Sequence, residues 1–211
     1  METNLEAPEI RVLGALIEKQ LSTPDYYPMT LNALIHACNQ KSNRDPVVTY
    51  RESDVLSALD TLQHRRLVGT ATGVGSRAVK YRHALAEAWS LSAAALAVLA
   101  ELLLRGPRTV GELRGRTGRM HTFEDTGQVQ EILTNLASRE APLALQLPRR
   151  AGQKEARFAH LLAGAPSEDP VAPPPAPGRD RIGALEDDIA QLKDRFASLE
   201  ALFESFRRQL E

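Results

Sequence analysis

The feature that most constrains the fold is a degenerate internal repeat, in which three helices followed by two strands occur twice along the chain. The clearest match pairs Pro28-x-Thr30-Leu31-x-x-Leu34 with Pro107-x-Thr109-Val110-x-x-Leu113, at an offset of 79 residues. The first helices align at an offset of about 86 residues and the third helices at about 74. The length differences therefore fall between elements, as expected of a duplicated domain.

In the first copy, apolar residues at helical spacing predict the helices. A second helix begins near Thr30, and Thr49 with Glu52 fits a capping box that opens the third. Strands are expected at residues 67–71 and 79–83, joined by a turn over 73–76. The predicted apolar faces of the first and third helices are Ile10, Leu13, Leu16, Ile17 and Leu21, and Val55, Leu56, Leu59 and Leu62.

The second copy follows the same order. Ser92 is placed to cap a helix that Gly106-Pro107 ends. The next helices are predicted over about 109–116 and 125–139, and the strands over 143–147 and 156–162.

Three helices and a hairpin form the plan of a winged helix-turn-helix domain. The predicted fold class is therefore mostly α with small β-hairpins (α+β), with two tandem winged-helix domains over residues 1–85 and 86–163. We expect each domain to close its own small core and to leave one helix and one hairpin free for binding.

Three segments carry a family resemblance. They are residues 28–46, residues 111–123 with Gly111-Glu112-Leu113-Arg114 and Arg119-Met120-His121, and residues 147–162 with Leu147-Pro148-Arg149-Arg150. Together they resemble the YceH-like family of bacterial proteins, over about residues 5–163. The resemblance implies two tandem winged helices and assigns no catalytic or ligand-binding residue.

The C-terminal part divides into a proline-rich linker, 164–179, and a predicted coiled-coil helix, 180–211. Apolar residues in the helix alternate at gaps of three and four, which is the heptad pattern of a coiled coil. A parallel homodimer would also pair Asp188 with Lys193, and Arg195 with Glu200, of the other chain. The alternative is a single amphipathic helix folded back on its own domains. The predicted oligomerisation residues are Ile182, Leu185, Ile189, Leu192, Phe196, Leu199, Phe203, Phe206 and Leu210.

Composition excludes several classes of protein. The single cysteine, Cys38, rules out a disulfide framework and a thiolate metal cluster. The N-terminus lacks a signal-peptide pattern, and the apolar run 91–104 is too short to span a bilayer, so we expect a cytoplasmic protein with no membrane partner. The five histidines are scattered, and Gly73-x-Gly75 precedes a strand instead of a helix, so neither an enzyme site nor a metal or other cofactor is predicted.

Basic residues in the loops, third helices and hairpins lead to two functional hypotheses. The first is a dimeric DNA-binding protein, such as a transcriptional regulator, in which the third helix enters the groove and the hairpins contact phosphates. The second is a protein-interaction scaffold, favoured by near-neutral repeats (+1 and +2) and by acidic residues on the third helices. The predicted DNA contacts are Lys41, Arg44, Arg51, Ser53, Ser57, Thr61, His64, Arg77, Lys80, Arg114, Arg116, Arg119, Arg149, Arg150 and Lys154.

Overall fold

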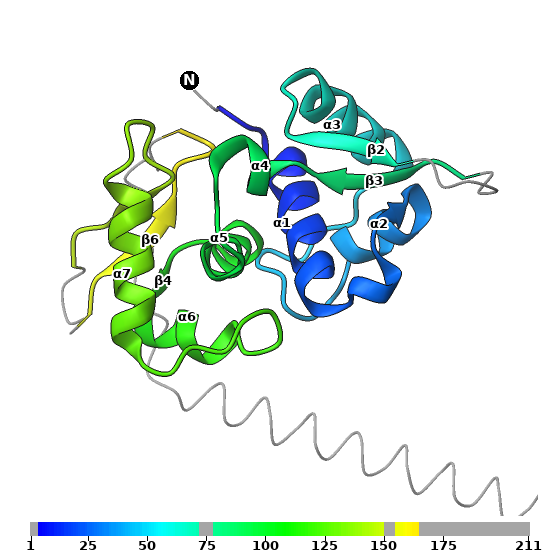
Figure 1. Ribbon diagram of the computed structural model, residues 1–211. Helices are drawn as coiled ribbons and strands as arrows, with labels where there is room; N and C mark the ends of the chain where they lie inside the picture. The colour runs from blue at the N-terminus through cyan, green and yellow to red at the C-terminus, as the bar shows by residue number, and fades with distance from the viewer. Residues whose placement is uncertain (1–3, 72–77, 150–154, 165–211) are drawn as a thin grey trace, which may run out of the picture. The chain divides into compact units, whose positions relative to one another are not determined.

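The computed structural model describes residues 4–71, 78–149 and 155–164, and the predicted linker and coiled-coil helix lie outside these ranges. The described chain is a mixed α+β protein (Figure 1). The first repeat consists of α1 (Ala7–Ser22), the 3-10 helix η1 (Pro24–Tyr26), β1 (Met29–Thr30), α2 (Leu31–Cys38), α3 (Glu52–His64), β2 (Val68–Ala71) and β3 (Lys80–His83).

A short helix, α4 (Leu85–Trp89), leads into the second repeat. The order of elements then recurs as α5 (Ala93–Arg105), β4 (Arg108–Thr109), α6 (Val110–Arg116), α7 (Thr126–Ala137), β5 (Ala144–Gln146) and β6 (Arg157–His160). The predicted succession of three helices and two strands is thus present in both repeats.

Each repeat contains a three-stranded antiparallel sheet, with strand orders β1-β3-β2 and β4-β6-β5. Val68 pairs with His83 in the first sheet, and Ala144 pairs with His160 in the second. The two-residue strands β1 and β4 were not predicted, because two residues are too few to show an alternating pattern. Each runs directly into the second helix of its repeat.

Capping side chains fix where these helices begin. The predicted cap at Ser92 is confirmed, since its Oγ accepts a hydrogen bond from the Ala95 amide at 3.2 Å. The predicted capping box of Thr49 and Glu52 is wrong. α3 begins at Glu52 itself, and the Asp54 carboxylate accepts a hydrogen bond from the Arg51 amide at 2.8 Å. The N-cap is therefore Arg51, two residues after the predicted Thr49, and Asp54 takes the place expected of Glu52.

The buried apolar residues of both repeats form one continuous cluster instead of two separate cores. Its centre is the pair α1 and α5, which lie side by side in Figure 1, with α2 and α3 beyond α1 and with α6 and α7 beyond α5. Every residue of α1 from Arg11 to Glu18 is buried, because both sides of the helix are covered. Residues Met1–Pro166 accordingly form a single compact unit, and independent domains over 1–85 and 86–163 stay a prediction.

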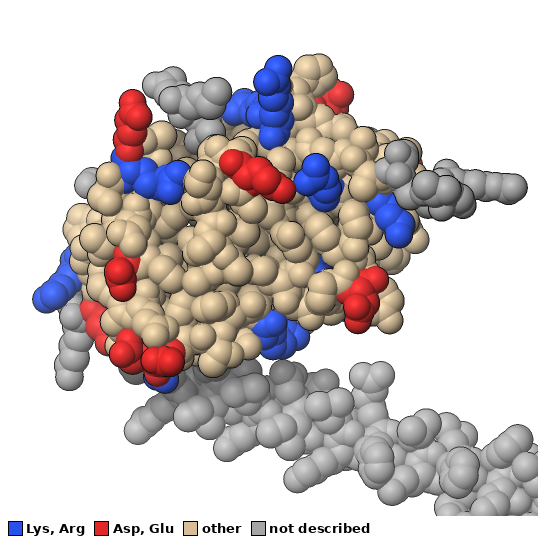
Figure 2. All heavy atoms as spheres, in the orientation of Figure 1, with Lys and Arg blue, Asp and Glu red and all other residues tan. Residues whose placement is uncertain are grey.

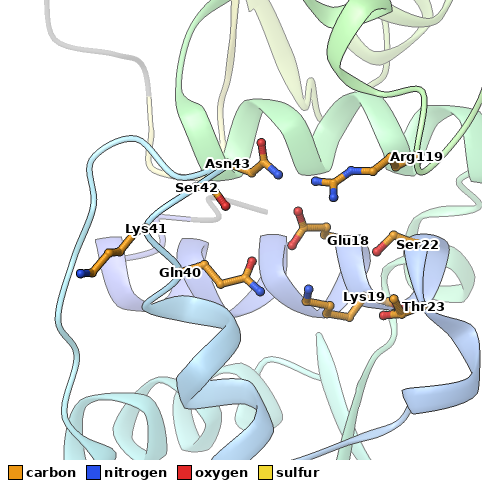
Figure 3. A pocket seen from close by; sticks show the side chains of 9 residues that line it. All are labelled: Glu18, Lys19, Ser22, Thr23, Gln40, Lys41, Ser42, Asn43 and Arg119. Carbon is orange, nitrogen blue, oxygen red and sulfur yellow. The ribbon is translucent and has the colours of Figure 1, made fainter. Parts of the chain in front are cut away.

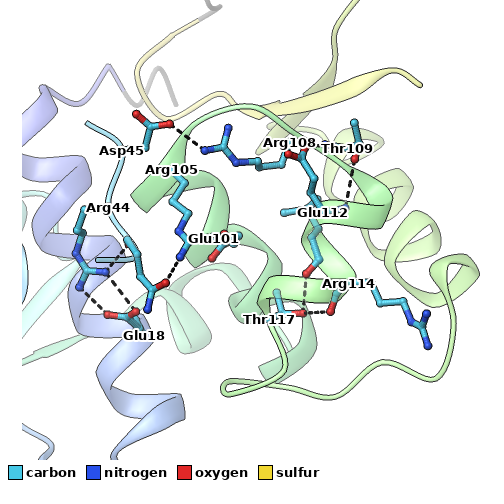
Figure 4. Close-up of polar contacts among 12 residues, drawn as sticks. Glu18, Arg44, Asp45, Glu101, Arg105, Arg108, Thr109, Glu112, Arg114 and Thr117 are labelled. Carbon is cyan, nitrogen blue, oxygen red and sulfur yellow. Dashed lines mark hydrogen bonds and ion pairs between the residues drawn. The ribbon is translucent and has the colours of Figure 1, made fainter. Parts of the chain in front are cut away.

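Polar contacts also join the repeats (Figure 4). Arg108 forms an ion pair with Asp45 at 2.9 Å, and Arg105 donates a hydrogen bond to Asn43. The Asp45 amide donates to the carbonyl oxygen of Leu104 at 2.9 Å. The loop between α2 and α3 is therefore fastened to the end of α5.

One predicted core residue is exposed. Leu56 is 40% exposed, whereas its helix neighbour Ala58 is buried. The apolar stripe of α3 is narrower than its sequence indicated, because the helix is covered on one side only. None of the helices within the described residues combines the length and the apolarity that a membrane span requires.

Candidate functional site

The outward face of α3 carries the residues predicted to contact bases. Ser53, Ser57 and His64 are exposed and Thr61 is half-buried. His64 Nδ1 lies 3.6 Å from Asp60 Oδ2, a contact that is an ion pair only when the imidazole is protonated. Leu56 lies on the same helix. The helix itself, Glu52–His64, contains no Lys or Arg, and the nearest preceding cation, Arg51, stands just before its first turn. The outward face of α3 therefore combines polar, acidic and apolar side chains and carries no Lys or Arg.

The equivalent helix of the second repeat, α7, also has no Lys or Arg between Thr126 and Ala137. Its exposed residues include Gln130, Glu131 and Thr134. Neither third helix therefore offers a cation to a DNA groove from its own length. The cations near each helix lie in adjacent loops and strands.

Four cations lie on the hairpins within the described residues. Lys80 and Arg157 are half-buried on β3 and β6, and Arg149 is exposed after β5. Arg82 on β3 is exposed and forms an ion pair with Glu87 at 3.6 Å. Arg77, Arg150 and Lys154 lie outside the described ranges. Figure 2 shows Lys and Arg interspersed with Asp and Glu on the face that it presents, without a continuous basic area.

The predicted phosphate contact Arg44 is wrong, because its side chain is fully buried. Its guanidinium forms a 2.6 Å ion pair with Glu18 and donates two hydrogen bonds to the carbonyl oxygen of Ala37 (Figure 4). A second buried arginine, Arg11, donates to the carbonyl oxygens of Cys38 and Pro46. These two arginines hold the loop between α2 and α3 in place.

Arg114, another predicted contact, is exposed, but its guanidinium donates a 2.7 Å hydrogen bond to the carbonyl oxygen of Glu124. It therefore fastens the loop between α6 and α7. The remaining predicted cations of the loops, Lys41, Arg116 and Arg119, are exposed. The structure brings Lys41 and Arg119 together at a different place, with Arg116 in an adjoining hollow.

That place is a polar cavity of about 440 Å³, here called the inter-repeat cavity. It lies between the C-terminal half of α1, the loop after α2 and the loop after α6 (Figure 3). Arg119 points into it towards Glu18 and Asn43, and the ammonium of Lys41 points outward at the rim. The lining residues are Glu18, Lys19, Ser22, Thr23, Gln40, Lys41, Ser42, Asn43 and Arg119.

An adjoining hollow of about 20 Å³ shares Glu18 and Arg119 and adds Glu101, Arg105 and Arg116. Both carboxylates are already neutralised, since Glu18 pairs with Arg44 and Glu101 pairs with Arg105 at 3.0 Å. Burial raises the pKa of Glu101, and the nearby Arg105 opposes this shift.

Four further cations of the two linings have no ion-pair partner among the described residues. The cavity is consequently a site of excess positive charge. These cations are Lys19, Lys41, Arg116 and Arg119.

Sequence reasoning identified three of these cations but assigned them to a DNA-binding face. Lys19 was missed, because a lysine in the last turn of a helix is ordinarily read as a complement to the helix dipole. The sequence gives no signal that α1 and the loop after α6 adjoin, since their contact depends on the pairing of the two repeats.

Other chemistry is limited within the described residues. No three His, Cys, Asp or Glu side chains there are grouped closely enough to hold a metal ion. Cys38 is fully buried, and burial raises the pKa of its thiol to about 12. The thiol therefore packs as a small apolar group.

These features define the class: a mixed α+β protein of two like repeats, which share one core and border a basic cavity. The chain belongs to the family described as "Protein of unknown function, DUF480", whose model matches residues 5–153. The resemblance to the YceH-like family is confirmed by relatives that carry the name UPF0502 protein.

Three such relatives illustrate the similarity. The chain is 50% identical to a UPF0502 protein of Geobacter sulfurreducens and 51% identical to one of Geobacter metallireducens, in both cases over the whole of both chains. It is also 50% identical to a UPF0502 protein of Opitutus terrae, over 90% of this chain and 83% of the relative.

Proposed function

We propose that both repeats are winged helices and that the chain is a non-enzymatic, cytoplasmic scaffold that binds another protein through α3. The observation that carries this proposal is the outward face of α3, where Leu56 is 40% exposed on the same helix as the exposed carboxylate of Asp60. An apolar side chain with a polar border suits a protein partner, whereas an acidic group repels DNA phosphates.

The predicted coiled-coil helix 180–211 belongs to this proposal as the means of forming a homodimer. Its heptad pattern would bring two copies of the repeats together and so present two equal α3 faces. A dimeric scaffold gains avidity for a partner that is itself repeated or dimeric.

The test is affinity purification of the tagged full chain from nuclease-treated extract of the source bacterium. We expect a protein partner to be retained in stoichiometric amount, and Leu56→Ser to lose it. The matched control is Leu145→Ser on β5, since Leu145 is 41% exposed and lies in the other repeat. Retention of the partner by Leu56→Ser, or no partner at all, would contradict the proposal.

DNA binding is the second candidate, favoured by the exposure of Arg51 and Arg149. Arg51 precedes the first turn of α3, and Arg149 follows β5, which are positions where winged helices contact phosphates. A gel shift with genomic DNA fragments at about 50 mM salt tests this candidate. Binding that weakens in Arg51→Gln and at higher salt supports it, and absence of binding removes it.

A further inference from the structure

We propose that the inter-repeat cavity binds a small phosphate-bearing metabolite. This proposal is independent of the scaffold function, because the cavity and the outward face of α3 use different residues. Its volume of about 440 Å³ lies within the range of sites that hold small molecules, and such sites occur preferentially where two structural units meet.

The charge of the cavity lining favours an anionic ligand. Lys19 and Arg119 approach the cavity from different repeats, and no carboxylate within the described ranges forms an ion pair with either. The one carboxylate in the lining, Glu18, is held by the buried Arg44. The lining therefore keeps an unbalanced positive charge, which a phosphate group would neutralise through charge-assisted hydrogen bonds.

The remaining lining favours a compact, hydroxyl-rich molecule. Gln40, Ser42 and Asn43 add amide and hydroxyl groups, and no aromatic ring lines the cavity within the described residues. Amides and hydroxyls pair well with a sugar, whereas a nucleobase would find no ring on which to stack. A sugar phosphate matches both the charge and the polar lining.

Binding at this place would connect the repeats, because Lys19 belongs to the first and Arg119 to the second (Figure 3). A ligand that binds only the folded chain stabilises it by mass action. We therefore expect the melting temperature to rise by about 5–10 °C when the ligand is present at about 100 times its dissociation constant.

The test measures melting temperature and calorimetric binding of the full chain with inorganic phosphate, pyrophosphate and ribose 5-phosphate, and with ribose as the uncharged comparison. We expect at least one phosphate compound to bind and ribose not to bind. Arg119→Gln and Lys19→Gln should each weaken binding about tenfold, since each removes one charged donor.

The matched control is Arg65→Gln, which removes an exposed arginine at the end of α3, outside the cavity. Its binding should equal that of the unmodified chain. Melting curves without ligand establish that the variants are folded, and the two cavity variants check each other. Failure of all three phosphate compounds at about 10 mM, or equal weakening by Arg65→Gln, would overturn the proposal.

Discussion

Gly14 of α1 lies directly against Leu104 of α5. A Cβ atom placed on Gly14 would stand 2.9 Å from both Cγ and Cδ2 of Leu104, and 3.1 Å from the Cβ of Leu103. Leu104 is itself buried, so its side chain has little room to retreat. The closeness of the two central helices therefore depends on the absence of a side chain at position 14.

Replacement of this glycine should weaken the whole fold. Gly14→Val is expected to lower the free energy of unfolding by about 2–4 kcal/mol, because a branched side chain overpacks the contact with Leu104. Gly115→Val is the matched control, since nothing lies within 4 Å of a Cβ at that exposed helical position. Its effect should stay within about 0.5 kcal/mol in urea denaturation. If Gly14→Val costs no more stability than Gly115→Val, then α1 and α5 can move apart to make room for the side chain.

The buried pair of Arg44 and Glu18 should stabilise the fold only while both partners are present. Arg44→Met is expected to cost about 3–5 kcal/mol, because it leaves the Glu18 carboxylate buried without its cation. The double variant Arg44→Met with Glu18→Leu should regain part of that loss. Denaturation of both single variants and the double variant yields the coupling energy. Additive effects would mean that the pair does not act as a unit.

Stability should fall on mild acidification. Burial lowers the pKa of His83 and of His160 to about 4, from an ordinary value of 6.5, and nearby Glu87 opposes the shift at His83. The folded state keeps both imidazoles neutral, whereas the unfolded chain takes up protons below pH 6.5. The stabilisation is therefore complete above about pH 6.5 and is lost progressively towards pH 4, by at most about 3 kcal/mol for each histidine.

This pH dependence is measured by urea denaturation between about pH 4 and 8. His83→Gln and His160→Gln should each flatten the profile. A profile that both buried-site variants leave unaltered would assign the acid sensitivity to other groups.

Cys38 should resist alkylation in the folded chain. Its thiol is buried and has a pKa of about 12, so very little reactive thiolate is present near neutral pH. Treatment with iodoacetamide at about pH 8, followed by mass spectrometry, should give no adduct in native buffer and a full single adduct in denaturant. The reading is unambiguous because the chain has one cysteine. Rapid native labelling would show that α2 opens frequently.

The heptad pattern predicts a homodimer, and light scattering measures its mass. The full chain should show twice its mass of 23.2 kDa, and Leu192→Asp should reduce this value to that of one chain. Gln191→Asp adds the same charge one residue earlier, at a position outside the apolar heptad pattern, and should leave the dimer intact. A monomeric unmodified chain would favour the folded-back alternative for this helix.

Local patterns in the sequence were sufficient to predict the order of the three long helices and the two longer strands of each repeat, because apolar spacing marks these elements and some helices carry a capping side chain. Ser92 and Thr109 each accept the capping hydrogen bond expected of such residues. The joining of the two repeats could not be predicted in the same way. Apart from Glu101 and Arg105, Ala93–Arg105 is apolar on all sides, which indicates burial without showing which helix covers it.

The candidate site was likewise predictable only in part from the sequence. Arg44, Arg119 and Lys41 were all identified as basic loop residues, but their different surroundings depend on tertiary packing. Arg44 is buried against Glu18, Arg119 points into the inter-repeat cavity, and Lys41 lies at its rim. Charge and position in the chain do not distinguish these three environments.

The close packing of α1 on α5 also has a geometric consequence. Because the two helices share one core, α3 and α7 are held at one separation and one relative orientation. A partner that engages both helices must present two matching sites with that same spacing. The protein would then select partners by the distance between their two binding sites as well as by their chemistry.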